Sequence, residues 1–187
     1  FDFALLPGEP GSTRYNVIAL PLDVIAQLPN ASTLAGYIGD SVQQVLHWDP
    51  VAQSYEAWLP PYSVGTNFPL RVGHVYWVQV NSDAPAIVSF VGGVPPQNAV
   101  RFNLVGGDQT CLFNELSLPL GQTGITSATV LAETLGTAGV EQALHWRADV
   151  HAFEYWLPEI DFGVDFTTRV GYPYHVCLTA GAPVVWP

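Results

Sequence analysis

The chain has 187 residues, of which 16 are acidic and five are basic, giving a formal net charge of -11 at pH 7. Hydrophobic residues make up 49% of the chain, which excludes intrinsic disorder because there is ample apolar surface to bury. All five basic residues are arginines, too few to neutralise many phosphates, so nucleic acids and anionic membrane surfaces are excluded as partners. No apolar stretch is long enough to predict membrane insertion.

The 17 glycines and 16 prolines divide the chain into many short elements, most of which are predicted strands. Runs rich in β-branched and aromatic residues predict strands in the first half at Phe3–Leu6, Val17–Leu22, Gln44–Trp48, Tyr55–Leu59, Val75–Val80 and Ile87–Val91. One short helix is predicted at Ser32–Ile38 with Ser32 as its N-cap, and its copy at Ala128–Leu135. The expected fold class is all-β with minor helix.

The second half of the chain repeats the first at an offset of 98 residues. The motifs Asn-x-x-x-Leu-Pro-Leu, Leu-His-Trp, Trp-Leu-Pro and Arg-Val-Gly-x-x-Tyr begin at Asn16, Leu46, Trp58 and Arg71, and again at Asn114, Leu144, Trp156 and Arg169. We therefore predict two tandem, pseudo-symmetric β-sandwich or barrel-like modules, residues 1–98 and 99–187. The Gly/Pro-rich segment Gly92–Asn98 is the expected seam between them.

This succession of motifs, present in both repeats, resembles the tandem β-rich modules of large secreted and surface proteins of environmental bacteria. The shared residues are apolar and structural. The resemblance therefore implies an extracellular module and no particular chemistry.

The ends and the cysteines of the chain also indicate an exported protein. The chain begins at Phe1 and has no methionine, as expected of a mature protein after signal-peptide removal. An even pair of cysteines, Cys111 and Cys177, suggests one disulfide in such a protein, while two buried free thiols fit the spacing equally well. Asn30-Ala31-Ser32 is a glycosylation sequon, although three residues are a weak signal.

The polar pattern with most chemical content is a histidine followed nine residues later by a glutamate, His47 with Glu56 and His145 with Glu154. In a symmetric hairpin these residues face each other across two strands. Such a pair can act as a general base with its orienting carboxylate, or it can be purely structural. Its presence in both copies favours the structural role. For the pair His47–Glu56 we expect contact within hydrogen-bond distance and a histidine pKa raised by the carboxylate.

Metal sites are not predicted. His74, His151 and His175 occur singly, without the spacing of a zinc site. Glu159, Asp161 and Asp165 share one loop and offer oxygen ligands for calcium, but the glycine-anchored spacing of an EF-hand is missing, so a solvated acidic loop is expected. No cofactor is expected either.

The tryptophans suggest an alternative function, a carbohydrate-binding or adhesion module that recognises a glycan. Exposed, coplanar indoles would form a sugar-stacking platform, whereas buried ones would remove this possibility. Five of the six lie in predicted strands at or near repeated positions, where core packing or a subunit interface is the default: Trp48, Trp58, Trp77, Trp146, Trp156 and Trp186.

The sequence does not indicate an enzyme. It has neither a nucleophile elbow nor a phosphate-binding glycine loop, and charged residues are only 11% of the chain. We expect a non-catalytic protein. A polar cleft with a strongly shifted ionisable residue, present in one module only, would contradict that expectation.

The two ends of the chain suggest self-association. Phe1–Leu6 is an apolar strand, and Val184–Pro187 is the counterpart of the strand that precedes the seam, so the chain ends where a following module would begin. We expect a secreted structural subunit that assembles head to tail into a filament or surface layer. The residues expected to mediate it are Phe1, Phe3, Leu5, Val185 and Trp186. The alternative is an N-terminal strand that pairs within its own chain.

Overall fold

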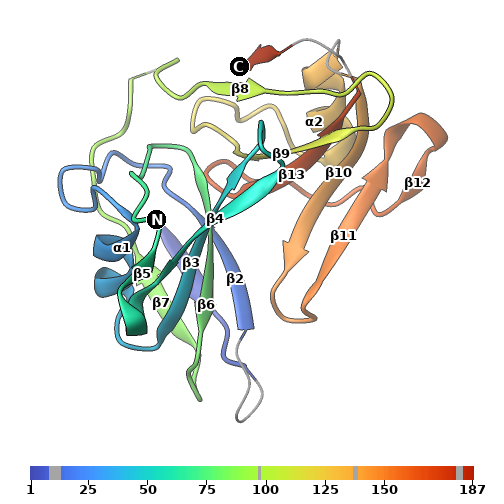
Figure 1. Cartoon of the computed structure of the whole chain (residues 1–187). Coiled ribbons are helices and arrows are strands. Elements are labelled where there is room, and N and C mark those ends of the chain that lie inside the picture. The colour runs from blue at the N-terminus through green and yellow to red at the C-terminus, as the bar shows by residue number, and fades with distance from the viewer. Residues whose placement is uncertain (9–13, 97, 137–138, 180–182) are drawn as a thin grey trace.

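A computed structural model describes residues 1–8, 14–96, 98–136, 139–179 and 183–187 (Figure 1). It confirms the predicted fold class, because strands dominate and the described residues form two short α-helices. The first half of the chain contains β1 (Asp2–Leu5), β2 (Arg14–Ala19), α1 (Ala31–Ile38), β3 (Val42–Asp49), β4 (Ser54–Leu59), η1 (Pro60–Tyr62), β5 (Val64–Gly65), β6 (Val75–Val80) and β7 (Ala86–Ser89). The second half contains β8 (Phe102–Leu104), β9 (Leu112–Ser117), α2 (Ala128–Leu135), β10 (Val140–Arg147), β11 (Ala152–Leu157), η3 (Pro158–Ile160), β12 (Phe162–Gly163), β13 (Pro173–Leu178) and β14 (Val184–Trp186).

Each half builds the same pair of antiparallel sheets. The five-stranded sheets have the orders β2-β6-β3-β4-β5 and β12-β11-β10-β13-β9, which are one order written from opposite ends. The two-stranded sheets pair β1 with β7 and β8 with β14. The structure thus consists of two similar modules, β1–β7 and β8–β14, which lie side by side in Figure 1.

Each module has a hydrophobic core of its own, formed where its helix and its small sheet meet its five-stranded sheet. The equivalent residues in the two cores are Phe3 and Phe102, Ile18 and Leu116, Leu34 and Leu131, Val45 and Ala143, and Val78 and Val176. The apolar motifs repeat because each copy fills the same interior.

The repeated asparagine ties the first strand of each module to the large sheet. The Asn16 side chain accepts a hydrogen bond from the Leu6 amide (2.8 Å) and donates one to its carbonyl (3.2 Å). Asn114 makes the same two bonds with Val105, both at 2.8 Å. Burying an amide is costly unless it is hydrogen-bonded, and these bonds offset that cost.

The Arg-Val-Gly-x-x-Tyr motif is a turn closed by its tyrosine. The Tyr76 hydroxyl accepts a hydrogen bond from the Arg71 amide, and the Tyr174 hydroxyl accepts one from the Arg169 amide, each at 2.8 Å. The glycine inside the turn has a positive φ in both copies, +83° in the first, which favours a residue without a Cβ.

Two local expectations were wrong. Helix α1 begins at Ala31 and is capped by Asn30, whose Oδ1 accepts from the Thr33 amide (3.1 Å) while the Thr33 hydroxyl accepts from the Asn30 amide (3.1 Å). Asn30 therefore holds the N-cap position that was predicted for Ser32, and the Ser32 hydroxyl donates to Asn30 Oδ1 (2.8 Å). The predicted strand Val17–Leu22 ends at Ala19, since Pro21 has no N–H with which to extend the ladder.

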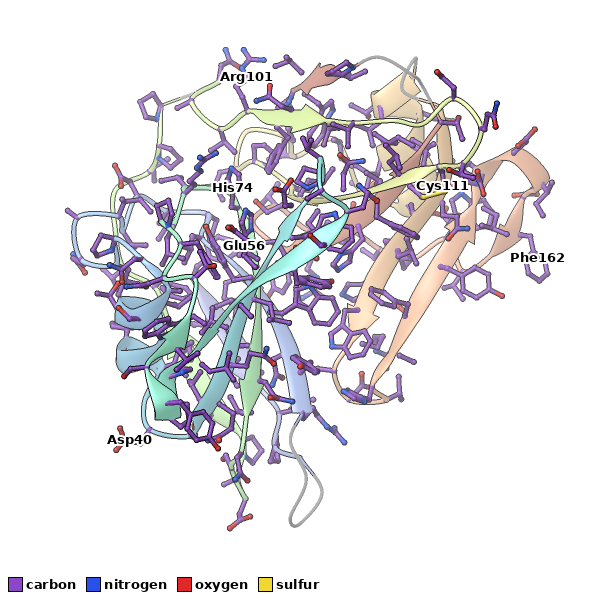
Figure 2. All side chains as sticks on the ribbon, viewed as in Figure 1. Asp40, Glu56, His74, Arg101, Cys111 and Phe162 are labelled. Atoms are coloured by element: carbon purple, nitrogen blue, oxygen red, sulfur yellow. A yellow bond between two sulfur atoms is a disulfide. The ribbon has the colours of Figure 1, made fainter. Side chains whose placement is uncertain are left out.

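Of the two alternatives for the cysteines, the structure shows the disulfide (Figure 2). Cys111 immediately precedes β9 and Cys177 lies in β13, with their Cα atoms 5.2 Å apart. The bridge spans 66 residues of the second module. It therefore fixes the pairing of β9 with β13.

The terminal strands pair within the chain, as in the alternative to strand exchange. β1 pairs with β7, and β14 pairs with β8. The terminal ammonium of Phe1 donates to the Phe90 carbonyl (2.8 Å), and the Phe1 ring contacts Tyr172 of the second module. Of the residues expected to mediate assembly, Phe3, Leu5 and Trp186 are buried. Head-to-tail assembly stays a prediction. Both terminal strands already have a partner within the chain, so neither is left unpaired to drive it.

The docking of β1 can be tested with a buried and an exposed side chain on the same small sheet. Phe3 is 4% exposed and Ile87, on β7, is 74% exposed. We expect Phe3→Ala to lower the free energy of unfolding by about 3–4 kcal/mol through lost packing. Ile87→Ala should change it by less than about 0.5 kcal/mol. Urea denaturation measures both, and equal effects would contradict the intramolecular position of β1.

Removing the disulfide should destabilise the protein through the unfolded state. Closing a loop of 66 residues corresponds to about 4 kcal/mol in the chain-entropy model, so Cys111→Ser/Cys177→Ser should lose about that much stability. A reducing agent should lower the melting temperature of the native chain and leave that of the double variant unchanged. A native chain insensitive to the reductant would show that the bridge contributes nothing to stability.

Candidate ligand site at the module interface

Two tryptophans hold the modules together through equivalent bonds. Trp48 Nε1 donates to the Phe113 carbonyl across the interface (2.8 Å), and Trp146 Nε1 donates to the Tyr15 carbonyl (3.0 Å). Donors and acceptors are each related by the 98-residue repeat, so each module contacts the other in the same way, as in an isologous dimer. The acceptors lie on β2 and β9, which are edge strands of the two large sheets.

Near the centre of this interface the two modules carry equivalent side chains of different size. Trp77 of β6 and His175 of β13 are equivalent residues, and their rings contact each other with centroids 5.5 Å apart. The Trp77 ring fills its side by packing against Trp146 (5.0 Å) and Phe153 (5.9 Å). The smaller His175 ring leaves the equivalent space on the other side unfilled.

That space is a pocket of about 270 Å³. We call it the aromatic pocket, and its lining residues are Trp48, Tyr55, Phe113, Glu115, Leu144, Phe153 and His175. The rings of Tyr55, Phe113 and Phe153 are each about 40% exposed, so its walls reach solvent. The seven lining residues come from β3, β4, β9, β10, β11 and β13, and therefore from both modules.

A buried carboxylate lies in the aromatic pocket. The Glu115 side chain is 7% exposed. Its Oε1 accepts hydrogen bonds from Trp77 Nε1 (2.6 Å) and the Tyr55 hydroxyl (3.3 Å), and lies 3.4 Å from His175 Nδ1. Its Oε2 has no partner in the described part of the chain. Oε2 is itself buried, so the carboxylate lacks a second hydrogen bond without exposing that oxygen to the pocket.

The electrostatics of the pocket are dominated by this carboxylate. Burial and the Glu115 charge raise the pKa of Tyr55, so its hydroxyl stays protonated and donates. Among the described residues, the ion-pair partner of Glu115 is His175, which is charged only when protonated. A negative charge is costly to bury without full pairing, and Glu115 also lines a second cavity that contains two arginines. The fold does not require that charge, because the equivalent residue of the first module is Val17.

A second cavity, the polar cleft, has a volume of about 340 Å³ and includes His47, Glu56, Arg71, His74 and Arg101 among its lining residues. Figure 2 labels Glu56, His74 and Arg101 along it. The His74 ring lies 5.7 Å from that of His47, and burial, with smaller effects from His47 and Arg71, lowers the pKa of His74 to about 4.

The polar cleft is of the kind that would contradict a non-catalytic protein, because the second module has Tyr172 in place of His74. Its described lining residues include no serine, threonine, cysteine, tyrosine or lysine, but they do include the carboxylates of Asp49 and Glu56 and the imidazoles of His47 and His74. Such groups serve in acid–base and in covalent catalysis. The expectation of a non-catalytic protein therefore stays a prediction.

The predicted hairpin register is confirmed, with His47 opposite Glu56 and His145 opposite Glu154. His145 Nδ1 lies 3.4 Å from Glu154 Oε2, but His47 Nδ1 is buried without a hydrogen-bond partner in the described chain. In the equivalent pair burial lowers the pKa of His145 more than Glu154 raises it, which is opposite in direction to the rise expected for His47. Arg147 also binds Glu154 (2.6 Å), which gives the carboxylate a stronger partner.

The remaining candidate ligands do not converge. Asp165 Oδ1 accepts from the Thr129 amide at the start of α2 (2.8 Å), and Asp161 occupies a left-handed turn after Glu159. His151 packs against the Trp146 ring. Within the described residues, no three His, Cys, Asp or Glu side chains are placed to hold a metal ion.

The tryptophans do not form an exposed platform. Trp77, Trp156 and Trp186 are buried, while Trp48, Trp58 and Trp146 are only partly exposed. Trp48 and Trp146 serve as interface donors, and the Trp77 and Trp146 rings are tilted by 60° rather than coplanar. The described indoles therefore offer no exposed coplanar platform, and a carbohydrate-binding or adhesion module stays a prediction.

Neither Glu115 nor the aromatic pocket was predicted from the sequence. The signal was present as differences between the copies: Val17 and Glu115, Trp77 and His175, and Tyr55 and Phe153 are equivalent pairs with unlike side chains. The predictions rested on residues that are identical in the two copies, and those residues maintain the fold.

Comparisons of the chain with protein-family models, curated proteins and solved structures find no match. None of the helices in the described ranges is long and apolar enough to cross a membrane. The geometry of the interface therefore supplies the argument for function.

The lowered pKa of His74 predicts an acid-sensitive contribution to stability. Between pH 6.5 and about 4 the unfolded chain binds a proton at His74 that the folded chain does not, so folding stability should fall as the pH falls through this window. The loss should reach about 2–3 kcal/mol. His74→Gln, and His74→Tyr, which copies Tyr172, should flatten this part of the curve. A variant curve parallel to that of the native chain from pH 6.5 to about 4 would contradict the assignment.

Proposed function

We propose that the chain is a secreted, non-catalytic binding protein whose ligand occupies the aromatic pocket between its two modules. The carrying observation is Glu115, a buried carboxylate with one oxygen unpartnered in the described structure, at a position where the first module has valine. A buried polar group that the fold does not require and does not fully satisfy is a reason to expect a ligand.

The composition of the pocket supports binding rather than catalysis. Its walls are mostly carbon, from four aromatic side chains and Leu144, and its titratable groups are Tyr55, Glu115 and His175. Apolar walls with a few convergent polar groups are typical of sites that hold a small ligand. The volume of about 270 Å³ suits a small molecule or one group of a larger one.

Secretion is proposed on the disulfide and on the resemblance to secreted modules. A bond between Cys111 and Cys177 persists in oxidising compartments and is rare in reducing ones. The strongly acidic surface, with no lysine, is compatible with such a location but does not require it.

Binding is preferred to head-to-tail assembly because the terminal strands already have partners and the edges of the five-stranded sheets are covered or short. The terminal strands are paired within the chain. The edge strands β2 and β9 each receive a tryptophan from the opposite module. The other edges of the two five-stranded sheets, β5 and β12, are two residues long, and short edges protect against strand addition.

The internal repeat provides a variant that tests the proposal. Glu115→Val/His175→Trp gives the second module the residues of the first and should fill the aromatic pocket. The matched control is Phe162→Ala, on the outer strand β12 (Figure 2) and 55% exposed. A library of small molecules and glycans is screened by ligand-observed NMR, with circular dichroism to check folding.

We expect compounds that bind the native chain and the Phe162→Ala control, and that lose binding to the folded double variant. Compounds that bind the double variant as well as the native chain would place the ligand elsewhere. The proposal would be contradicted if no compound in the library bound the native chain more tightly than the double variant.

A further inference from the structure

We propose that the aromatic pocket recognises an organic cation, an alkylated ammonium group, with Glu115 as its counter-ion. This inference rests on the proposed binding function and names the chemical class of the ligand. It draws on three independent properties of the pocket: its charge, the arrangement of its rings and its size.

The charge of the pocket favours a cation. The hydrogen bonds from Trp77 and Tyr55 both end on Oε1 of Glu115, which also lies 3.4 Å from His175 Nδ1, and Oε2 is buried without a partner in the described chain. Because Oε2 has no accessible surface, a ligand meets Glu115 as a negative charge rather than as a hydrogen-bond acceptor, which favours a cation over a neutral sugar hydroxyl. The net charge of -11 also raises the local concentration of cations near the protein.

The rings of the pocket meet at steep angles rather than lying parallel. Trp48 and Tyr55 contact each other at 4.8 Å with an interplanar angle of 65°, and Phe153 meets the His175 ring at 87°. A flat sugar ring stacks on a flat platform, which these residues do not provide. Walls that meet at angles enclose a compact, roughly spherical group and present several π faces and edges to it. Aromatic rings attract a cation that lies over their negative faces.

The apolar walls favour an alkylated ammonium over a bare one. A primary ammonium is strongly hydrated, and most of the pocket offers no acceptor to replace the lost water. Alkyl substituents spread the charge over carbon and bury apolar surface against the rings and Leu144. About 270 Å³ accommodates such a head group, while the exposed edges of Tyr55, Phe113 and Phe153 leave a route for the rest of a larger ligand.

The test compares choline with its uncharged isostere 3,3-dimethylbutan-1-ol, using the native chain. Binding is followed by titration of the tryptophan indole N–H signals in ¹H–¹⁵N NMR spectra, since Trp77 Nε1 donates to Glu115 and Trp48 lines the pocket. We expect choline to bind at least about tenfold more tightly than the isostere. Increasing sodium chloride should weaken choline binding and leave that of the isostere unchanged.

Glu115→Gln keeps the shape of the side chain and removes its charge. It should reduce choline affinity by about tenfold or more and leave the isostere at its native affinity. Since that variant could lose its fold, the salt dependence of the native chain is the second, independent measurement. The matched control is Glu133→Gln, on the outer helix α2, which should bind choline as the native chain does.

The possible failures are distinguishable. Equal affinity for choline and the isostere would overturn the cation inference while leaving a ligand pocket. Failure of choline to bind, together with pocket-dependent binding of another class in the library, would also overturn this inference and leave the proposed function standing. Absence of every pocket-dependent response would overturn both.

Discussion

The paired indole–carbonyl bonds between the modules are the constraint on which the rest of the structure depends. A β-sheet edge presents unpaired amides and carbonyls, and two modules of this size expose one such edge each, β2 and β9, toward the other. Trp48 and Trp146 cover these edges reciprocally, and the Gln53 side chain adds bonds to both the amide (2.9 Å) and the carbonyl (3.0 Å) of Phe113. With the edges covered, the modules form one unit, and the space enclosed between them has fixed walls.

Duplication lets the fold and the site be separated without any other protein for comparison. Adjacent residues of β9 illustrate the contrast. Asn114 is identical to its counterpart Asn16, is buried in its own module and makes the same two hydrogen bonds. Glu115 points to the other face of the strand, has Val17 as its counterpart and lies at the interface. The residue that is identical in the two copies is one that each module needs in order to fold. The residue that differs belongs to the interface, which exists only when the two modules are together.

The sequence was sufficient for the features that depend on neighbours within one module. It predicted the repeat, the strands, helix α2 and the hairpin register that places His145 opposite Glu154. It failed where a property depends on how distant parts pack. The pKa of His145 falls because the rings of Phe166 and Tyr174 pack against it, and a strand such as Phe1–Leu6 has the same composition whether it pairs inside or between chains. The aromatic pocket belongs to neither module alone, so no motif within one repeat could reveal it.

The position of the disulfide links the site to the redox state of its surroundings. Glu115 and His175 are direct partners in the ladder between β9 and β13. In the same ladder Phe113 pairs with Cys177, two positions away. Shifting this ladder by one residue would turn Glu115 from the interface into the core, since side chains alternate between the faces of a sheet. The bridge between Cys111 and Cys177 blocks that slip. The redox state of the surroundings would therefore decide how firmly the Glu115 and His175 side chains are held at the interface.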